Sequence, residues 1–270
     1  MVWQANNPDS WFKCLPAPSP LDHKYDRGHA GIIGASHLVG ATRLAATACS
    51  RIGAGLVTVI ASETASIYRT ALPPEIMVME EHFAPRKTPS VILAGCGGVS
   101  PPLFRMFHES FADCFWVLDA EAILLALTQR ADLQNKAVIT PHQGEFDRAF
   151  PTVSGTIEEK ASKIAKLNKV IVVLKGPRTV IASPDGRMKI NVHASPYLAT
   201  AGTGDVLAGL ITGLIAQEMP PFEACCASVW MHGEAALRFG PGMIAGDIPD
   251  LIPSVLGDVL TLRNQNDVDK

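Results

Sequence analysis

The sequence lacks the two short glycine motifs that mark the common nucleotide-binding folds. Gly-x-x-x-x-Gly-Lys-Ser/Thr is missing from the whole chain, and Gly-x-Gly-x-x-Gly is missing near the N-terminus. These absences exclude a P-loop nucleotide hydrolase and a dehydrogenase with the usual dinucleotide fingerprint. Gly53-Ala54-Gly55 is not such a fingerprint, because it precedes a predicted strand instead of following one.

Paired cysteines, excess basic charge and long apolar runs are missing too. The six cysteines are scattered without Cys-x-x-Cys spacing, so we expect reduced core residues of a cytoplasmic protein, not disulfides or a zinc site. The net charge of -3 argues against nucleic acid as the main partner. No run approaches the roughly eighteen apolar residues that cross a bilayer, and residues 1–20 have no basic region followed by an apolar run. We therefore expect neither a membrane span nor a signal peptide.

What the sequence does have is a regular alternation of two kinds of apolar segment. Short β-branched segments predict strands over residues 30–33, 56–60, 91–94, 115–119, 137–140 and 170–174. Segments with helical spacing or many small residues predict helices over residues 40–52, 64–72, 101–111, 120–129, 156–168, 206–215, 222–239 and 248–260. Residues 179–182 and 188–192 predict a hairpin. The fold class is therefore α/β, with a mainly parallel, twisted sheet and helices on both of its faces.

The chain divides into three parts of unequal size. Residues 1–22 are rich in Pro, Asn, Asp and Ser, which predicts an extended arm that lies on the body of the protein or on another subunit. Residues 23–262 predict a single domain, because no linker or internal repeat interrupts them. Residues 263–270 predict a polar, frayed tail.

Residues 199–209 predict a flexible loop that runs directly into a buried helix. Gly202 and Gly204 flank Thr203, and glycine lets a ligand approach the backbone closely. The first turn of the helix offers unpaired N–H groups and the positive end of the helix dipole, which together bind anions such as phosphate. Since Asp205 would repel a phosphate, we interpret it as a base that deprotonates a hydroxyl about to be phosphorylated. The alternative is that Asp205 only caps the helix.

Several further candidate site residues follow directly after predicted strands. They are Gly95-Cys96-Gly97-Gly98, Asp119, His142 and Lys175. In a parallel sheet, ligands bind beyond the C-terminal ends of the strands, so we expect these residues to line one site with the 202–205 loop. His142 is a candidate donor to a substrate oxygen or amide, while Glu145 either caps the next helix or lies near metal-bound water. Lys175 is a candidate contact for phosphate or ribose, and Asp119 positions a metal, orients a loop or is structural.

A series of motifs also occurs in a fixed order along the chain. The motifs are Gly40-Ala41-Thr42, Gly53-Ala54-Gly55-Leu56-Val57-Thr58-Val59, Pro74-Glu75-Ile76-Met77-Val78, Val117-Leu118-Asp119-Ala120, Thr140-Pro141-His142-Gln143-Gly144-Glu145-Phe146, Val173-Leu174-Lys175-Gly176 and the 199–209 loop. In this order they make the chain similar to the ADP-dependent NAD(P)H-hydrate dehydratases, a branch of the ribokinase-like fold. The resemblance covers residues 24–260.

The resemblance implies a repair enzyme. The hydroxyl of a hydrated nicotinamide ring is phosphorylated at the expense of ADP, which leaves AMP, and phosphate is then eliminated to restore NADH or NADPH. Asp205 would contact the ring and act as the base, while Ala41, Gly97 and His142 would bind the hydrated cofactor. The nucleotide side would be lined by Lys175, Gly176, Pro177, Arg178, Thr179, Gly202, Thr203 and Gly204. Magnesium is expected with the phosphates, without an assigned protein ligand, and a homo-oligomer, specifically a homotetramer, is expected as the assembly.

The sequence departs from the family's usual pattern at a few positions. Ala201 stands where the family usually has a third glycine, Cys96 where it usually has proline, and Ala35 where glycine is common. Residues 193–197 lack the Thr-Gly-Asn that often precedes the loop, and residues 1–22 are too short for the epimerase domain that is fused to many relatives.

Two other functions stay open at this point. A vitamin or sugar kinase of the same fold would share residues 202–205 but release a phosphorylated product. A nucleotide-binding subunit without activity would account for the departures around the loop. Residues 40–42 and 140–145 favour the dehydratase over the kinase.

Overall fold

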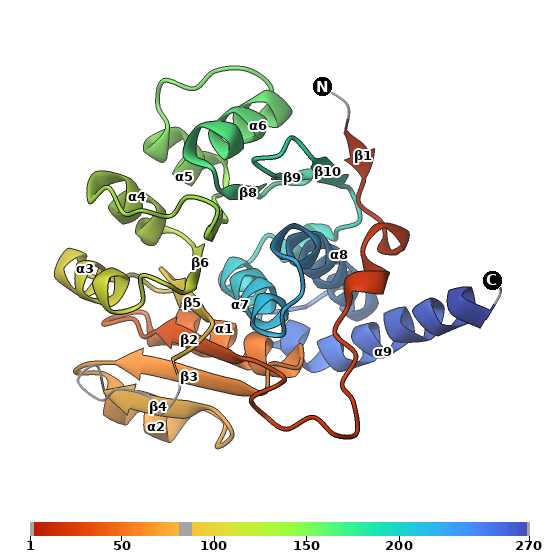
Figure 1. Cartoon of the computed structure of the whole chain (residues 1–270), viewed down its shortest axis with the longest axis horizontal. Coiled ribbons are helices and arrows are strands. Elements are labelled where there is room, and N and C mark those ends of the chain that lie inside the picture. Colours follow the sequence, from red (N-terminus) through yellow and green to blue (C-terminus); the bar gives the residue numbers. More distant parts are fainter. Residues whose placement is uncertain (1–2, 81–87, 269–270) are drawn as a thin grey trace.

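The computed structural model describes residues 3–80 and 88–268 of the chain (Figure 1). Its strands form one sheet in the order β1-β10-β9-β8-β7-β6-β5-β2-β3-β4. Their bounds are β1 Gln4–Ala5, β2 His29–Ile33, β3 Leu56–Ala61, β4 Met77–Glu80, β5 Val91–Ala94, β6 Phe115–Leu118, β7 Ala137–Ile139, β8 Ile171–Leu174, β9 Thr179–Ala182 and β10 Met188–Asn191. β2 to β8 pair in parallel, whereas β9 is antiparallel to both β8 and β10. The predicted parallel sheet and hairpin are both confirmed.

Helices cover both faces of this sheet, as predicted. Their bounds are α1 Val39–Arg51, α2 Ala65–Ala71, α3 Pro101–Ser110, α4 Glu121–Thr128, α5 Gln143–Ala149, α6 Ile157–Asn168, α7 Thr203–Ala216, α8 Pro221–Phe239 and α9 Asp247–Val268. Alternate strand residues point to opposite faces, so Val91 and Leu93 belong to the core beneath α1, α7 and α8, while Ile92 and Ala94 belong to the core beneath α3 to α6. Figure 1 shows these two groups of helices on opposite sides of the strands.

Close packing of α1 against α7 explains why the sequence has small residues in these two helices. A Cβ atom on Gly209 would lie 2.2 Å from the carbonyl oxygen of Ala45, and one on Gly213 would lie 2.3 Å from a methyl carbon of Ile52. Only glycine lets the two helices approach this closely. The small residues of α1 therefore pack within the chain.

The N-terminal arm lies on the body of its own chain. β1 extends the sheet by parallel pairing with β10. Trp11 is 1% exposed, packs against Trp230 with ring centroids 6.0 Å apart, and donates from Nε1 to Asn6 at 3.1 Å. Asn6 in turn donates to Asn191 and to the carbonyl oxygen of Cys226. The arm is thus part of the folded core of its own chain. The sequence left open whether it lies there or on another subunit.

The tail that the sequence predicts to be frayed is helical as far as residue 268. α9 continues through Val268, and the Arg263 guanidinium donates to the carbonyl oxygen of Leu15 at 3.1 Å. This contact ties the last turns of α9 to the arm, which the polar composition of the tail could not reveal. Residues 269–270 lie outside the described part of the chain.

All six cysteines are free, and five of them are buried. None of the described helices combines the length and the apolar character needed to cross a bilayer.

Candidate active site

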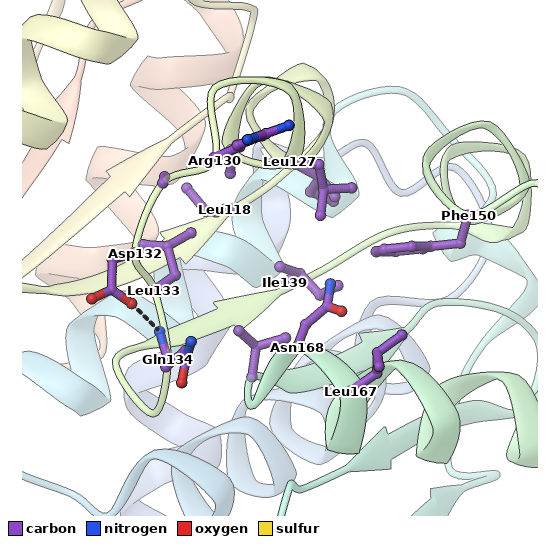
Figure 2. Close-up of a pocket in the computed structure, with 14 residues that line it drawn as sticks. Leu118, Leu127, Arg130, Asp132, Leu133, Gln134, Ile139, Phe150, Leu167 and Asn168 are labelled. Atoms are coloured by element: carbon purple, nitrogen blue, oxygen red, sulfur yellow. Dashed lines mark hydrogen bonds between the residues drawn. The ribbon is translucent and has the colours of Figure 1, made fainter.

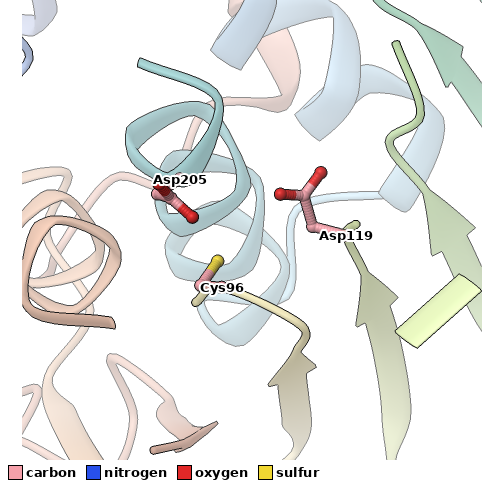
Figure 3. Close-up of side chains that lie close together, drawn as sticks. All are labelled: Cys96, Asp119 and Asp205. Atoms are coloured by element: carbon pink, nitrogen blue, oxygen red, sulfur yellow. The ribbon is translucent and has the colours of Figure 1, made fainter. Parts of the chain in front are cut away.

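The predicted site residues meet where the parallel strands end. Cys96 follows β5, Asp119 follows β6, and Lys175 follows β8, while Asp205 lies in the first turn of α7, which points at these strand ends. One ligand atom each from Cys96, Asp119 and Asp205 lies within 4.8 Å of the other two (Figure 3). Residues more than 100 positions apart in sequence thus form one cluster.

Asp119 and Lys175 form an ion pair at the base of this cluster. The Lys175 Nζ atom donates to Asp119 Oδ1 at 2.8 Å, and the Thr140 hydroxyl donates to the same oxygen at 2.7 Å. The two charged side chains are 17% and 6% exposed. Burial by itself lowers the pKa of Lys175, but the negative charges of Asp119 and Glu145 raise that pKa above its ordinary value overall. Lys175 therefore stays cationic, and the Asp119 carboxylate is held by two side chains of the protein.

The loop before α7 has the geometry of the anion-binding turn that the sequence predicts. Gly202 begins the helix with φ of 94°, and a Cβ atom there would lie 2.5 Å from Leu44. A Cβ atom on Gly204 would lie 3.1 Å from Lys175 Nζ, so the ammonium group sits directly beside the helix N-terminus. The Thr203 hydroxyl donates to the carbonyl oxygens of residues 198 and 200. This turn therefore offers a ligand backbone N–H groups and a cation.

Asp205 does not cap α7, which removes the alternative interpretation of this residue. The N-cap is Gly202, and the helix has no side-chain capping bond. Burial and, to a smaller extent, the charge of Asp119 raise the pKa of the Asp205 carboxyl to about 6, although the nearby Cys96 thiol and the charge of Lys175 oppose the increase. The side chain is nevertheless only partly buried. A partly exposed carboxylate with a pKa near neutrality suits a general base.

His142 begins α5, a helix that the sequence did not predict. Its Nδ1 atom accepts from the N–H groups of Gly144 at 3.0 Å and Glu145 at 3.3 Å, and Glu145 accepts from the His142 N–H at 2.8 Å. Glu145 thus completes a capping box at the start of α5. Because Nδ1 accepts two bonds, the proton of the neutral ring resides on Nε2. The side chain is 55% exposed, and its Nε2 atom lies 3.4 Å from Glu145 Oε1.

Gly97 and Ala41 both lie next to the carbonyl oxygen of Leu38. A Cβ atom on Gly97, which has φ of 84°, would lie 2.4 Å from the carbonyl oxygen of Leu38. The Ala41 N–H donates to that same oxygen at 3.0 Å. The Thr42 hydroxyl then joins the two loops, because it donates to the carbonyl oxygen of Cys96 and accepts from the N–H of Ala35. Residues 41 and 97, two of the predicted substrate contacts, therefore belong to loops that hydrogen bonds join to each other.

The turn after Lys175 is less closely tied to this cluster. Gly176, Pro177 and Arg178 are exposed. Arg178 pairs with Glu158 of α6 at 3.4 Å, and the Thr179 hydroxyl donates back to the carbonyl oxygen of Gly176 at 3.1 Å. These residues can border a ligand at Lys175, but the side chain of Arg178 is directed to α6.

The donor atoms of the cluster do not fit magnesium. Mg²⁺ prefers oxygen ligands in octahedral geometry, whereas one of the three donors is the Cys96 thiol. Asp119 already accepts from Lys175 and Thr140. No residue in this cluster is therefore assigned to a metal.

Two cavities differ in their relation to the site. A cavity of about 440 Å³ between α4 and α6 is lined by Leu127, Phe150, Leu167 and neighbours, and none of the predicted site residues lines it (Figure 2). A second cavity, of about 480 Å³, is lined by Gly40 and Leu44 of α1 and by residues 71–73 and 246. Since Leu44 also touches Gly202, this second cavity borders the anion-binding turn.

Comparisons with known proteins agree with this geometry. Residues 30–254 match the family model described as NAD(P)H-hydrate dehydratase. The chain is 34% identical to the ADP-dependent (S)-NAD(P)H-hydrate dehydratase of Neisseria meningitidis, over 84% of each chain. It is 35% identical to the bifunctional NAD(P)H-hydrate repair enzyme Nnr of Thermosynechococcus vestitus, over 85% of this chain and 49% of that protein. The chain thus spans about half the length of the bifunctional relatives that it matches.

Solved structures give the same result. A ribokinase-like superfamily protein from Enterococcus faecalis superposes with a TM-score of 0.83 at 26% identity, covering 95% of this chain and 96% of that one. The ADP/ATP-dependent NAD(P)H-hydrate dehydratase of Bacillus subtilis, co-crystallised with ATP/Mg²⁺, superposes with a TM-score of 0.82 at 25% identity, covering 96% and 99%. The ribokinase-like fold and the family inferred from the sequence motifs are both confirmed: the chain belongs to the NAD(P)H-hydrate dehydratase family.

Proposed function

We propose that this chain catalyses the ADP-dependent dehydration of hydrated NADH or NADPH, releasing AMP and phosphate. One observation carries the proposal: a partly exposed carboxylate, Asp205, whose pKa burial raises to about 6, stands beside an anion-binding turn and a lysine. A base and a phosphate site in contact are what phosphorylation of an alcohol requires.

The chemistry has two steps. Asp205 takes the proton of the ring hydroxyl, whose oxygen attacks the terminal phosphorus of ADP, and AMP leaves. The ring nitrogen lone pair then expels the new phosphate ester as inorganic phosphate, and loss of a proton from the adjacent ring carbon restores the double bond. Hydroxide is a poor leaving group and phosphate a good one, which is why ADP is consumed.

The residues of this chain have separate roles in these two chemical steps. The N–H groups of residues 202–204 and the Lys175 ammonium hold the terminal phosphate. His142 donates from Nε2 to the substrate, while Ala41 and Gly97 bring bare backbone against it. The turn over residues 176–179 borders the nucleotide. Magnesium, when bound, neutralises phosphate charge, and we assign it no protein ligand.

Recovery of NADH absorbance tests the proposal. Hydrated NADH, ADP and magnesium with the purified chain should regain the absorbance of NADH, with one AMP and one phosphate formed for each NADH. Asp205→Asn should abolish this turnover and leave nucleotide binding largely intact, whereas Asp250→Asn, on the exposed surface, should not affect it. A parallel series with ATP and with hydrated NADPH determines which nucleotide and which cofactor are preferred.

The same assay distinguishes the alternatives. A vitamin or sugar kinase would leave the absorbance unchanged and phosphorylate its own alcohol with release of a stable product. A subunit without activity would bind nucleotide and turn over neither substrate. The dehydratase name of the Neisseria relative, which this chain matches over 84% of that protein, supports the dehydratase instead.

We also propose that the chain forms a homo-oligomer, with a homotetramer as the specific expectation, and that it acts in the cytoplasm. The small residues of α1 pack against α7 of the same chain, so they do not support the oligomer. Light scattering tests the assembly, and a monomeric mass would refute it.

A further inference from the structure

The loop that leads into α7 is tied to α8 at its first residue, His193. The His193 Nε2 atom lies 2.7 Å from Glu234 Oε2. The imidazole also stacks on the Trp230 ring, with centroids 4.6 Å apart and 9° between the planes. A Cβ atom on Gly233 would lie 2.0 Å from the His193 carbonyl oxygen, so the backbone of α8 meets the loop here. One bond, one ring stack and one close backbone approach therefore fix this residue on α8.

The carboxylate that holds His193 is itself fixed. The other oxygen of Glu234 accepts from Arg238 Nε at 2.8 Å, and Arg238 pairs with Asp258 of α9 at 2.7 Å. Burial by itself raises the pKa of Glu234, but its hydrogen bonds with Arg238 and His193 lower that pKa below its ordinary value. The group is therefore ionised and can only accept. It follows that His193 donates from Nε2.

The far end of the loop is bonded to the anion-binding turn. The Ser195 hydroxyl accepts from the N–H of Tyr197 at 3.3 Å and so begins a short 3₁₀ helix over residues 196–198. The Thr203 hydroxyl forms hydrogen bonds to the carbonyl oxygens of residues 198 and 200, at 2.8 and 3.1 Å. Thr203 lies between the two glycines of the turn. Contacts therefore lead from α8, through His193 and the 3₁₀ helix, to the turn.

The middle of the loop has little packing of its own. Residues 196, 197 and 199–201 are exposed, so few buried contacts hold them in place. A segment of this kind takes its position from its anchors. The anchor at residue 193 also lies where the sequence departs from the family's usual pattern, since residues 193–197 lack the Thr-Gly-Asn that often precedes the loop.

We propose that His193 is a positioning residue for the terminal phosphate of ADP, and that its bond to Glu234 holds the loop so that the N–H groups of residues 202–204 face one anion. This inference rests on the proposed function. A helix N-terminus binds phosphate through N–H groups directed at it. A loop that is ordered beforehand lowers the entropy that binding costs. His193 acts through the loop, and the turn makes the contact.

Calorimetric titration with ADP and with AMP tests this role. His193→Ala should weaken ADP binding about fivefold, because one ordering bond and one stack are lost. AMP binding should change by less than about twofold, because AMP lacks the phosphate that the turn holds. His193→Gln keeps an N–H donor near the place of Nε2 and should recover most of the ADP affinity. A merely structural role would weaken both nucleotides alike, without recovery in the glutamine variant.

His23→Ala is the matched control. His23 also pairs with a carboxylate, Asp26, at 2.6 Å, but it lies before β2, at the opposite end of that strand from the site. Its loss should leave both affinities unchanged. If His193→Ala fails to fold, His193→Phe replaces it, because phenylalanine keeps the stack and loses the bond, and about threefold weaker ADP binding is expected. An ADP affinity equal to that of the parent in the folded variant overturns the inference, as does an equal loss for ADP and AMP.

Turnover separates this inference from the proposed function. In the assay with hydrated NADH, His193→Ala should raise KM for ADP about fivefold and leave KM for hydrated NADH unchanged. Restored NADH with the parent's KM for ADP would overturn the inference and leave the proposed function standing. An ADP-selective loss of binding in a chain that does not restore NADH would support the role of His193 and count against the proposed function alone.

Discussion

Replacing Asp205 by asparagine should stabilise the fold at neutral pH while it abolishes turnover. Burial raises the pKa of this carboxyl from 3.8 to about 6, so the folded chain binds more protons than the unfolded chain between these two values. The free energy of unfolding of the parent therefore falls as pH rises through this window, and it stays lower above it. Asparagine has nearly the same shape and no charge. The free energy of unfolding of the variant therefore does not fall in this way as pH rises.

The magnitude follows from the size of the pKa shift. A shift of about two units corresponds to roughly 3 kcal/mol, which is an upper limit because the side chain is only partly buried. After an allowance for the hydrogen bonds of the new amide, we expect a gain of about 1–2 kcal/mol at pH 8. For a chain of this length that is an increase of about 2–4 °C in Tm.

Thermal melting of the two proteins across pH 5 to 8 checks the reasoning. About half of the penalty is already present at pH 5, so the difference in Tm should roughly double between pH 5 and 8. Asp250→Asn, whose side chain is 74% exposed, should melt with the pH dependence of the parent. A difference in Tm that is the same at both ends of the range, or an Asp205→Asn protein that is less stable at pH 8, would refute a carboxylate held under strain by burial.

Three further predictions concern residues that stabilise the site, the packing of α1 on α7, and the N-terminal arm. Lys175→Met leaves Asp119 buried without its partner and should lower the free energy of unfolding by about 3–5 kcal/mol, measured in urea, with partial recovery when Asp119→Asn is added. Gly209→Ala places a Cβ atom 2.2 Å from a carbonyl oxygen of α1 and should lower Tm clearly, whereas Gly246→Ala, whose Cβ would meet nothing within 4 Å, should change stability by less than about 0.5 kcal/mol. Trp11→Ala should cost about 3–5 kcal/mol in the same urea experiment, and a loss below about 1 kcal/mol would mean that the arm is not part of the core.

The sheet could be predicted because its strands have a local signature. Segments such as residues 170–174 are β-branched and continuous, as fits strands buried on both faces, and the helices between them keep a helical period. Once the sheet is parallel, Asp119 and Lys175 are expected at one edge, since each follows a strand. Gly202 and Asp205 could be predicted for a local reason. A glycine loop that opens a helix offers unpaired N–H groups whatever the rest of the fold is.

What the sequence could not predict depends on contacts between distant segments. β1 has two residues, and it exists because β10 presents an edge to it. The bond between Lys175 and Asp119 requires that β6 and β8 lie on either side of β7. α5 is short, and the capping box from His142 to Glu145 stabilises its start. The continuation of α9 depends on the arm, through the bond from Arg263 to residue 15.

The position of Asp205 depends on glycines deeper in its own helix. α7 can point its first turn at the strand ends only if its body lies close to α1, and Gly209 and Gly213 permit that approach. Gly209 is one turn beyond Asp205, so a side chain there would push the helix from α1 and move the carboxylate away from Cys96 and Lys175. Catalysis depends on placement within about 1 Å. Gly209→Ala should therefore lose kcat/KM at temperatures well below its own Tm, and an unchanged kcat/KM there would refute the dependence.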